Sequence, residues 1–223
     1  MPDSTPQVLT IDVVSDAICP WCYIGKRRLR AALDQLAERD PALRPVVRWH
    51  PFQLNPGMPP QGMDRRAYLE AKFGGAAGAA QVYERIAAVG DNVGIAFAFD
   101  RIARVPNTVD AHRLIAWGQA QGDGDSLVEA LFRAFFIDGR DVGEREVLAA
   151  LATDAGLDAG AARDYLASTQ GVADIAAADR RARELSIGGV PFFIFGQRVA
   201  VSGAQEPSTL LGAIDEAQRA RAD

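Results

Sequence analysis

The chain has 223 residues, of which 48% are hydrophobic and 24% are charged, and its formal net charge is −5 at pH 7. This is the composition of a globular protein that is long enough to bury a sizeable core. Its acidic balance argues against sequence-independent binding of nucleic acid, which needs a basic face. No apolar run is long enough to cross a membrane, and the start lacks a recognisable secretory signal. We therefore expect a cytoplasmic protein that binds neither nucleic acid nor membrane.

The N-terminal part predicts a strand, a helix and a second strand. The β-branched run at 8–14 is typical of a strand. Pro20 fits the first turn of a helix, and Leu29, Leu33 and Leu36 continue that helix to about residue 40. The run at 46–52 predicts the next strand. Parallel pairing of the two strands would make a right-handed strand–helix–strand unit.

Helical periodicity dominates the middle of the chain, after a linker at 55–62 that is rich in Pro and Gly. Residue 64 fits the cap of the first helix, and a glycine follows its end. An apolar stripe at 127–136 predicts a helix facing the core. The segment 95–99 alternates like a strand but has no evident partner. The other helices are expected at 64–73, 76–90, 107–121, 144–155 and 171–185.

The C-terminal part returns to strands. Residues 190–195 and 198–201 predict a hairpin with its turn at 196–197, and Pro207 opens a last helix that runs to about residue 219. Strands at both ends with helices between them predict one α/β domain interrupted by an all-helical insertion. The expected boundaries are 1–62 and 186–223 for the α/β domain and 63–185 for the insertion.

The two cysteines, Cys19 and Cys22, form the sequence Cys19-Pro20-Trp21-Cys22 at the expected start of the first helix. Thiol–disulfide exchange needs a thiolate nucleophile and a second thiol that resolves the mixed disulfide. The positive end of the helix dipole favours the thiolate of the first cysteine. Cys19 is therefore the candidate nucleophile and Cys22 the candidate resolving residue, while Trp21 offers apolar surface to a substrate.

Other interpretations of the cysteine pair compete with exchange. A structural zinc ion needs four ligands, and His50 and His112 lack the spacing of a zinc motif, so we expect no metal. Two buried structural cysteines fit poorly between a proline and an aromatic residue at a strand–helix turn. An inactive pair in a binding module stays open.

The segment 15–25, SDAICPWCYIG, resembles the active site of DsbA-like thioredoxin-fold oxidoreductases, in particular the FrnE-like branch. Segments 50–56, 107–114, 188–193 and 201–205 resemble the same branch, so the resemblance covers nearly the whole chain. It implies a thioredoxin fold interrupted by an all-helical domain. It also implies a cis peptide between Val190 and Pro191, in a loop beside the nucleophilic sulfur.

The resemblance further implies how a substrate is held. Val190 would pair its backbone with an extended substrate chain. The implied substrate-binding residues are Pro20, Trp21, Gly189, Val190 and Pro191. Electrons would travel as dithiol and disulfide without a metal or organic cofactor. The implied partners are a thiol or disulfide protein or a small thiol, with glutathione as a candidate redox partner or cosubstrate, and a homodimer is compatible.

The family also resembles 2-hydroxychromene-2-carboxylate isomerases and kappa-class glutathione transferases, which typically place a serine where this chain has Cys19. Because this chain keeps both sulfurs, we predict a thiol–disulfide oxidoreductase. Glutathione-dependent isomerisation or transfer is the alternative enzyme activity, and a chaperone-like binding module is the non-enzymatic alternative.

The remaining polar candidates have plainer interpretations. His112 is expected to be a helix histidine hydrogen-bonded between domains, with a base lining the cleft as the alternative. His50 is expected to be structural. The basic run of Lys26, Arg27, Arg28 and Arg30 predicts a solvated helix face, with an influence on the thiols or on an anionic substrate as the alternative.

Overall fold

The computed structural model describes residues 7–122 and 124–222. In chain order, the elements are β1 (Gln7–Ser15), α1 (Pro20–Arg39), β2 (Leu43–Pro51), β3 (Met63–Asp64), α2 (Arg65–Phe73), α3 (Ala76–Asp91), the 3₁₀ helix η1 (Phe99–Arg101), β4 (Arg104–Val105), α4 (Val109–Gln121), α5 (Gly124–Phe136), α6 (Arg145–Asp154), α7 (Ala159–Ala167), α8 (Val172–Glu184), β5 (Phe192–Phe195), β6 (Val199–Ser202) and α9 (Pro207–Ala222).

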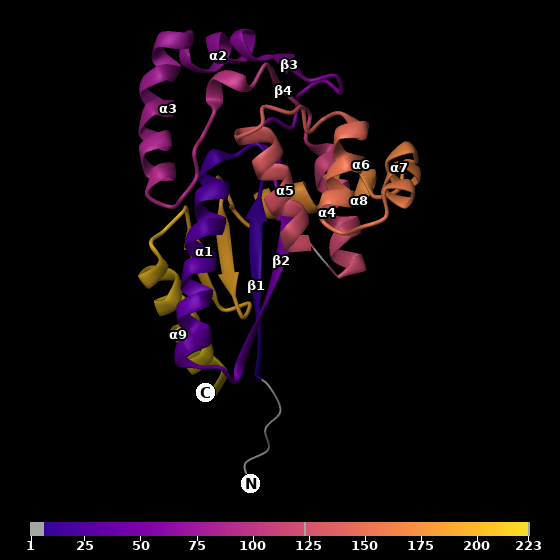
Figure 1. Ribbon diagram of the computed structural model, residues 1–223. Coiled ribbons are helices and arrows are strands. Elements are labelled where there is room, and N and C mark those ends of the chain that lie inside the picture. Colours follow the sequence, from indigo (N-terminus) through magenta and orange to yellow (C-terminus); the bar gives the residue numbers. More distant parts are fainter. Residues whose placement is uncertain (1–6, 123, 223) are drawn as a thin grey trace.

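The central sheet has the strand order β2-β1-β5-β6. Strand β1 runs parallel to β2 and antiparallel to β5, and β5 runs antiparallel to β6 (Figure 1). This confirms the predicted strand–helix–strand unit and the C-terminal hairpin. Gly196 and Gln197 have φ angles of 57° and 61°, which suit the type I′ turn of a two-residue hairpin loop.

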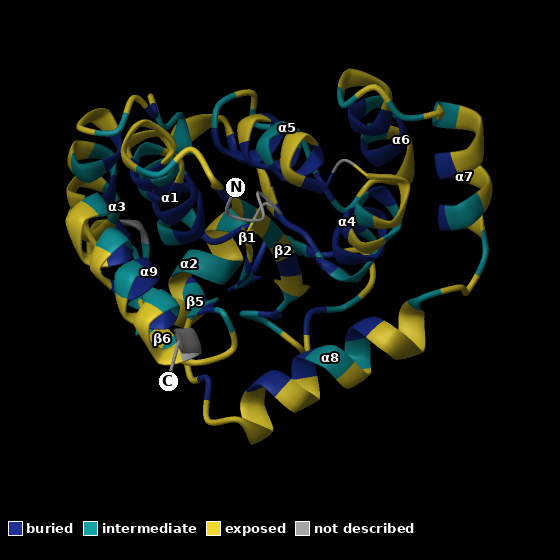
Figure 2. Ribbon diagram, turned by 90° about the horizontal axis from the view of Figure 1, so that it is seen from below, coloured by how far each residue is buried: buried dark blue, intermediate teal, exposed yellow. Residues whose placement is uncertain are grey.

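Helices surround this sheet on several sides. Figure 1 shows α1 and α9 next to each other along the sheet, α4 to α8 on the side of β2, and α2 and α3 beyond the end of α1. Figure 2 shows that the buried residues gather where these helices meet the strands. The α/β architecture with helices between its two sets of strands is as predicted, while the boundaries at 62/63 and 185/186 stay a prediction. In the part of the chain described, no helix is long and apolar enough to span a membrane.

An aromatic cluster joins α1 to α5. The ring of Tyr23 stacks on that of Phe132 with 5.0 Å between centroids, and Phe97 stacks on Phe99 at 4.8 Å. Phe136 contacts both Tyr23 and Phe97. The alternating segment 95–99 is therefore a connection whose aromatic side chains pack against α5, and the buried stripe predicted on α5 is confirmed.

Two local features escaped the sequence analysis. The side chain of Asp158 caps α7 by accepting a hydrogen bond from the backbone N–H of Ala161 at 2.6 Å. A capping residue of this kind marks a helix start, so Asp158 was the signal in the sequence from which α7 could have been predicted. Strands β3 and β4 pair over two residues each, which is too short for an alternating pattern.

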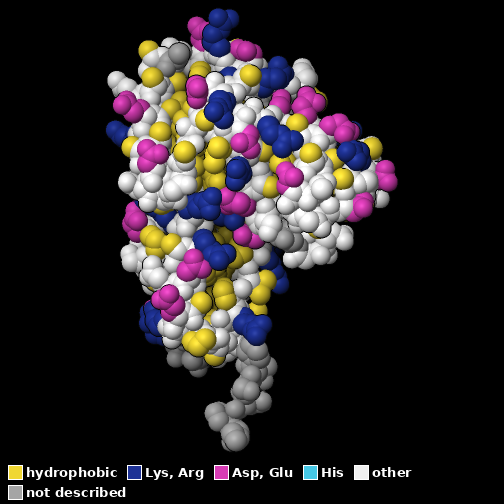
Figure 3. All heavy atoms as spheres, viewed as in Figure 1, with side chains coloured by type: hydrophobic (Ala, Val, Ile, Leu, Met, Phe, Trp, Pro, Cys, Tyr) yellow, Lys and Arg dark blue, Asp and Glu magenta, His cyan; other side chains and the backbone are white. Residues whose placement is uncertain are grey.

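The prediction of a solvated basic face on α1 is wrong for Lys26 and Arg28. The Lys26 amine is 2.8 Å from an Asp125 carboxylate oxygen and the residue is 8% exposed. Arg28 pairs with Glu206, and Arg30 alone keeps to the exposed face. Figure 3 shows basic and acidic side chains next to each other over this side of the molecule. Lys26 thus ties α1 to α5, and Arg28 ties α1 to the residue before α9, so both are structural.

Candidate active site

Cys19 is the N-cap residue of α1, directly after the turn that leaves β1. Its backbone is extended, with φ −93° and ψ 113°, and Pro20 begins the helix. The Cys19 N–H donates to the carbonyl oxygen of Asp16 at 3.0 Å, and the Cys19 carbonyl accepts from the N–H of Cys22 at 3.0 Å. The two cysteines are free thiols in this structure. The strand-to-helix turn thus fixes both sulfurs at the end of β1.

The loop before β5 lies against Cys19. The thiol of Cys19 donates to the carbonyl oxygen of Val190, with 3.6 Å between sulfur and oxygen. The peptide bond between Val190 and Pro191 is cis. Gly25 allows this approach, because a Cβ there would lie 2.9 Å from Cγ of Pro191. Sequence reasoning quoted Gly25 within the motif but gave it no role, since the contact joins residues far apart in the chain.

Cys22 lies deeper, at 1% exposure. Burial raises the pKa of the Cys22 thiol well above its usual range, and the neighbouring Cys19 adds to the rise. Hydrogen bonds from the Ser15 side chain and the Asp16 backbone oppose the rise because they favour the thiolate. Cys22 is therefore a protonated thiol at neutral pH, and it must lose its proton before it can act as a nucleophile.

A cleft of about 300 Å³ opens beside Cys19. One wall contains five of the predicted site residues, namely Cys19, Pro20, Trp21, Gly189 and Val190. Cys22 and Pro191 lie outside the lining, and both are buried. The opposite wall comes from α2, α3, η1 and α5, and it is largely aromatic and aliphatic, including Tyr68, Tyr83, Ile86, Phe99 and Phe136.

Arg65 and Lys72 of α2 also line the cleft, and sequence reasoning missed both. The Arg65 guanidinium lies 4.9 Å from the ring centroid of Tyr83, and the Lys72 amine donates to the hydroxyl of Tyr68 at 2.6 Å. No carboxylate side chain is among the residues that line the cleft. The site therefore combines a sulfur, an apolar wall and two cations, which suits a substrate with an apolar body and a negative charge.

The two histidines lie apart from this cleft. His50 contacts Asp12, with 2.8 Å between Nε2 and Oδ1, which agrees with a structural role. His112 is buried on α4, and its Nε2 is 3.3 Å from Oδ1 of Asp16. These two atoms are within ion-pair distance, although neither makes a hydrogen bond, and the expected hydrogen bond of His112 between domains stays a prediction. Within the described residues, no three His, Cys, Asp or Glu side chains gather as a metal site requires.

Three solved structures are similar to this chain. A probable DsbA oxidoreductase from Streptomyces coelicolor is 32% identical, with a TM-score of 0.83, and the match covers 94% of this chain and 90% of that one. A 2-hydroxychromene-2-carboxylate isomerase is 18% identical, with a TM-score of 0.69 and coverage of 96% and 98%. The cytosolic disulfide reductase DsbM from Pseudomonas aeruginosa, in a structure with GSH, is 22% identical, with a TM-score of 0.61 and coverage of 94% and 96%.

The last two similarities concern the fold, because their identities are low. The first extends to the sequence, and a family model described as a DSBA-like thioredoxin domain matches residues 10–215. This range includes both cysteines, the helices α2 to α8 and the loop at Pro191. The chain therefore belongs to the DsbA-like thioredoxin domain family of oxidoreductases.

Proposed function

We propose that this protein is a thiol–disulfide oxidoreductase that uses Cys19 as nucleophile and Cys22 as resolving residue. One observation carries the proposal: two free thiols stand at the start of α1, with Cys19 facing the Val190 carbonyl in the wall of an apolar cleft. In this proposal Cys19, which lines the cleft, meets the substrate, and the buried Cys22 then attacks Cys19.

The proposed reaction balances as two exchanges. The Cys19 thiolate attacks a substrate disulfide, whose S–S bond breaks, and one substrate sulfur leaves as a thiolate that takes up a proton. The deprotonated Cys22 then attacks Sγ of Cys19, which forms the Cys19–Cys22 disulfide and releases the second substrate thiol. Two electrons pass from the cysteine pair to the substrate, and the reverse sequence oxidises a dithiol.

Substrate contacts in this proposal fall to the residues around Cys19. Trp21 and Pro20 contribute apolar surface, and Gly189, Val190 and Pro191 frame an extended chain or small disulfide. Glutathione is the first thiol to test, because it carries the negative charge that the cleft favours and because DsbM was solved with it. The cytoplasmic location is part of this proposal, and cell fractionation checks it.

The reduction potential of the pair tests the proposal. The protein is equilibrated in glutathione buffers, free thiols are alkylated, and the Cys19–Cys22 disulfide is counted by mass spectrometry. We expect a two-electron transition, and a midpoint near −270 mV would indicate a reductase, whereas one of about −180 to −120 mV would indicate an isomerase or oxidase. Failure to form the bond in any buffer would contradict the proposal.

A matched variant separates disulfide exchange from glutathione-dependent isomerisation. Cys22→Ser leaves Cys19 in place but removes the resolving thiol. We expect this variant to stall as a stable mixed disulfide at Cys19, visible as an added mass, with turnover lost. Turnover of a glutathione-dependent isomerisation that survives Cys22→Ser would instead favour the isomerase. Protection of an unfolded client by a Cys19→Ser/Cys22→Ser double variant would favour the chaperone-like module.

A further inference from the structure

Two loops that carry cleft residues rest on one small group of apolar side chains. Leu54 follows β2 and Val190 precedes β5, and both line the cleft beside Cys19. Both also pack against a satellite cluster that is separate from the main core and consists of Val14, Phe52, Ala182 and Ile187. Because Ala182 belongs to α8, this helix takes part in the support of both loops.

A charged pair on α8 holds the first of these loops by its backbone. Gln53 is 6% exposed, and its N–H donates to a carboxylate oxygen of Asp179 at 2.8 Å. Its carbonyl oxygen accepts from the Arg183 guanidinium, which also donates to both oxygens of Asp179. The guanidinium lies 4.3 Å from the ring centroid of Phe52. The chain leaves the sheet here, and the pair makes the two backbone hydrogen bonds that a neighbouring strand would otherwise make.

The same segment is tied to the strand and the turn that precede the nucleophile. The Phe52 N–H donates to the carbonyl oxygen of Ser15 at 3.0 Å. The Leu54 N–H donates to a carboxylate oxygen of Asp16 at 2.8 Å. Three consecutive amides, those of residues 52 to 54, therefore bind β1, α8 and the turn after β1 in succession. A shift of the middle residue would move Leu54 within the cleft wall.

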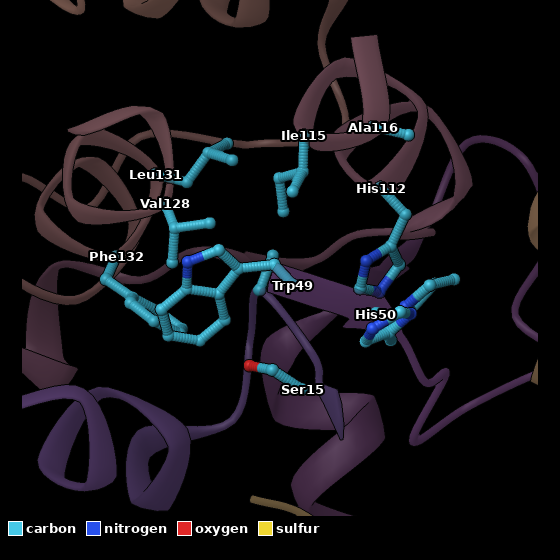
Figure 4. Close-up of a pocket in the computed structure, with 11 residues that line it drawn as sticks. Ser15, Trp49, His50, His112, Ile115, Ala116, Val128, Leu131 and Phe132 are labelled. Atoms are coloured by element: carbon cyan, nitrogen blue, oxygen red, sulfur yellow. The ribbon is translucent and has the colours of Figure 1, made fainter. Parts of the chain in front are cut away.

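Packing gives the end of β2 little support on the side of α4 and α5. A small cavity lies there, bordered by Trp49 and His50 of β2 and by Ser15 of β1, with side chains of α4 and α5 on its other sides (Figure 4). Atoms that border a void lack contacts on that side. The segment after β2 therefore depends on the hydrogen bonds from α8 and β1 for its position.

The end of α8 leads directly to the second loop. The Ile187 N–H donates to the Ala182 carbonyl at 3.1 Å. The Ser186 N–H donates to the Arg183 carbonyl at 2.9 Å. These two bonds form a Schellman motif, which the apolar side chains of Ile187 and Ala182 accompany in the satellite cluster. Ser186 has a φ of 62°, a conformation that a residue other than glycine keeps only where its surroundings hold it. The backbone from α8 toward Val190 is thus fixed over its first residues.

We propose that Asp179 and Arg183 are positioning residues for disulfide exchange. The inference rests on the proposed function. The pair holds the segment after β2 and anchors the end of α8 that leads to the loop at Val190. Neither residue lines the cleft, so both act on a substrate through Leu54 and Val190. A substrate whose peptide backbone pairs with Val190 should depend on Asp179 and Arg183, whereas a reagent that needs only the Cys19 sulfur should not.

Two reagents with the same leaving group separate these cases on the reduced full-length protein. In the mixed disulfide of glutathione with thiopyridine, the Cys19 thiolate attacks the glutathione sulfur and the S–S bond breaks. The thiopyridine sulfur leaves with the electron pair of that bond and takes up a proton. In dithiodipyridine the same kind of bond breaks, but no peptide has to be held. Stopped-flow absorbance of the released thiopyridone gives both rates.

Variants locate the effect. We expect Arg183→Met and Asp179→Asn each to slow the reaction with the glutathione reagent by about fivefold or more, and the reaction with dithiodipyridine by less than about twofold. Arg180→Met is the matched control, because it removes the same charge from an exposed position of the same helix, and it should leave both rates unchanged. A loss of stability alone would not alter the ratio of the two rates, since both reagents react with the same folded protein.

The outcomes keep this inference separate from the proposed function. Absence of reaction between the wild type and either reagent would contradict disulfide exchange itself. Wild-type rates in both variants, or equal slowing with both reagents, would overturn only the positioning role. A wild type that reacts with dithiodipyridine alone would overturn it as well, because no peptide is then held.

Near-UV circular dichroism checks that each variant is folded. If a variant is not folded, Arg183→Lys decides the question. A lysine keeps the charge beside Asp179 but lacks the planar fork that also reaches the Gln53 carbonyl, so we expect the glutathione reagent to react at least about threefold more slowly. A wild-type rate in Arg183→Lys would then overturn the proposal.

Discussion

His112 and Arg113 are neighbours on α4 and both are buried, but they differ in how far their polar atoms are hydrogen-bonded. The Arg113 guanidinium donates to a carboxylate oxygen of Asp110 at 2.6 Å. It also donates to four backbone carbonyls around the end of α7, namely those of Tyr165, Leu166, Ser168 and Gln170. His112 Nε2 has no hydrogen-bond partner although Asp16 is 3.3 Å away. The Arg113 guanidinium thus bonds to five hydrogen-bond acceptors and joins α4 to the end of α7, whereas Nε2 of His112 makes no hydrogen bond.

This contrast follows from what each position must do. The last carbonyls of a helix have no partners within the helix, and Arg113 supplies them for α7. A fully bonded guanidinium has one stable arrangement and stays charged. The Nε2 atom of His112 makes no hydrogen bond and so fixes no neighbouring element in this way. The contacts of Arg113 are therefore expected to contribute more to stability than those of His112.

Breaking the Arg113 centre should have the largest effect. Arg113→Met keeps much of the apolar stem but removes the hydrogen bonds that the guanidinium donates to one Asp110 oxygen and to the four carbonyls. We expect a loss of about 3–5 kcal/mol in the free energy of unfolding, measured by urea denaturation. Arg145→Met is the control, because this exposed side chain pairs with the same Asp110 and its loss should cost under about 1 kcal/mol. Equal losses of unfolding free energy in the two variants would contradict the structural role of Arg113.

The free energy of unfolding of the reduced protein should depend on pH because of Cys22. Because the folded state raises the pKa of Cys22, folded protein keeps this proton at a pH where the unfolded chain has lost it. The stability from this thiol is thus present below the ordinary thiol pKa of about 8.5–9 and is lost as pH rises above it, by up to about 1.4 kcal/mol per unit. Urea denaturation of the reduced protein at alkaline pH measures this slope. In Cys22→Ser the slope should be clearly smaller, and an unchanged slope would assign it to other groups.

Arg65 and Lys72 line the cleft and are expected to favour anionic substrates. Arg65 and Lys72 rest on aromatic rings, and among the described residues neither pairs with a carboxylate. We expect Arg65→Gln/Lys72→Gln to slow the reaction of Cys19 with the anionic dithiobis(nitrobenzoate) by about 3–10-fold, with little change for the neutral dithiodipyridine. Arg66→Gln is the control, since Arg66 lies on α2 outside the cleft lining. An equal decrease in the reaction rate with both reagents would mean that Arg65 and Lys72 do not favour the anionic reagent over the neutral one.

The sequence was sufficient where local patterns set the outcome. The alternation in β1, the proline at the start of α1 and the turn between β5 and β6 are encoded within a few residues, so the sheet and the position of Cys19 were predictable. The family resemblance pointed to the loop at Val190. The rest depends on tertiary placement. Lys26 is structural because α5 brings Asp125 to it, and nothing near Lys26 in the sequence indicates this.

The same limit applies to the site. Arg65 and Lys72 belong to a helix that sequence predicted well, but its position over Cys19 depends on how α2 and α3 pack. His112 was correctly placed on a helix, but its contact with Asp16 joins residues far apart in the chain, so no periodicity indicates it. The sequence located the candidate nucleophile Cys19, whereas the residues packed around it could be identified only from the structure.

Replacing His112 should change the stability of the protein only slightly. His112→Gln preserves a polar side chain of similar reach, and Nε2 has no hydrogen bond to lose. We therefore expect the free energy of unfolding at neutral pH to change by about 1 kcal/mol or less, far below the change for Arg113→Met. Urea denaturation of the reduced protein measures it, with His50→Gln as the second histidine variant. A loss as large as that of Arg113→Met would make His112 a structural residue. A small loss would mean that two adjacent buried residues of one helix contribute very differently to stability.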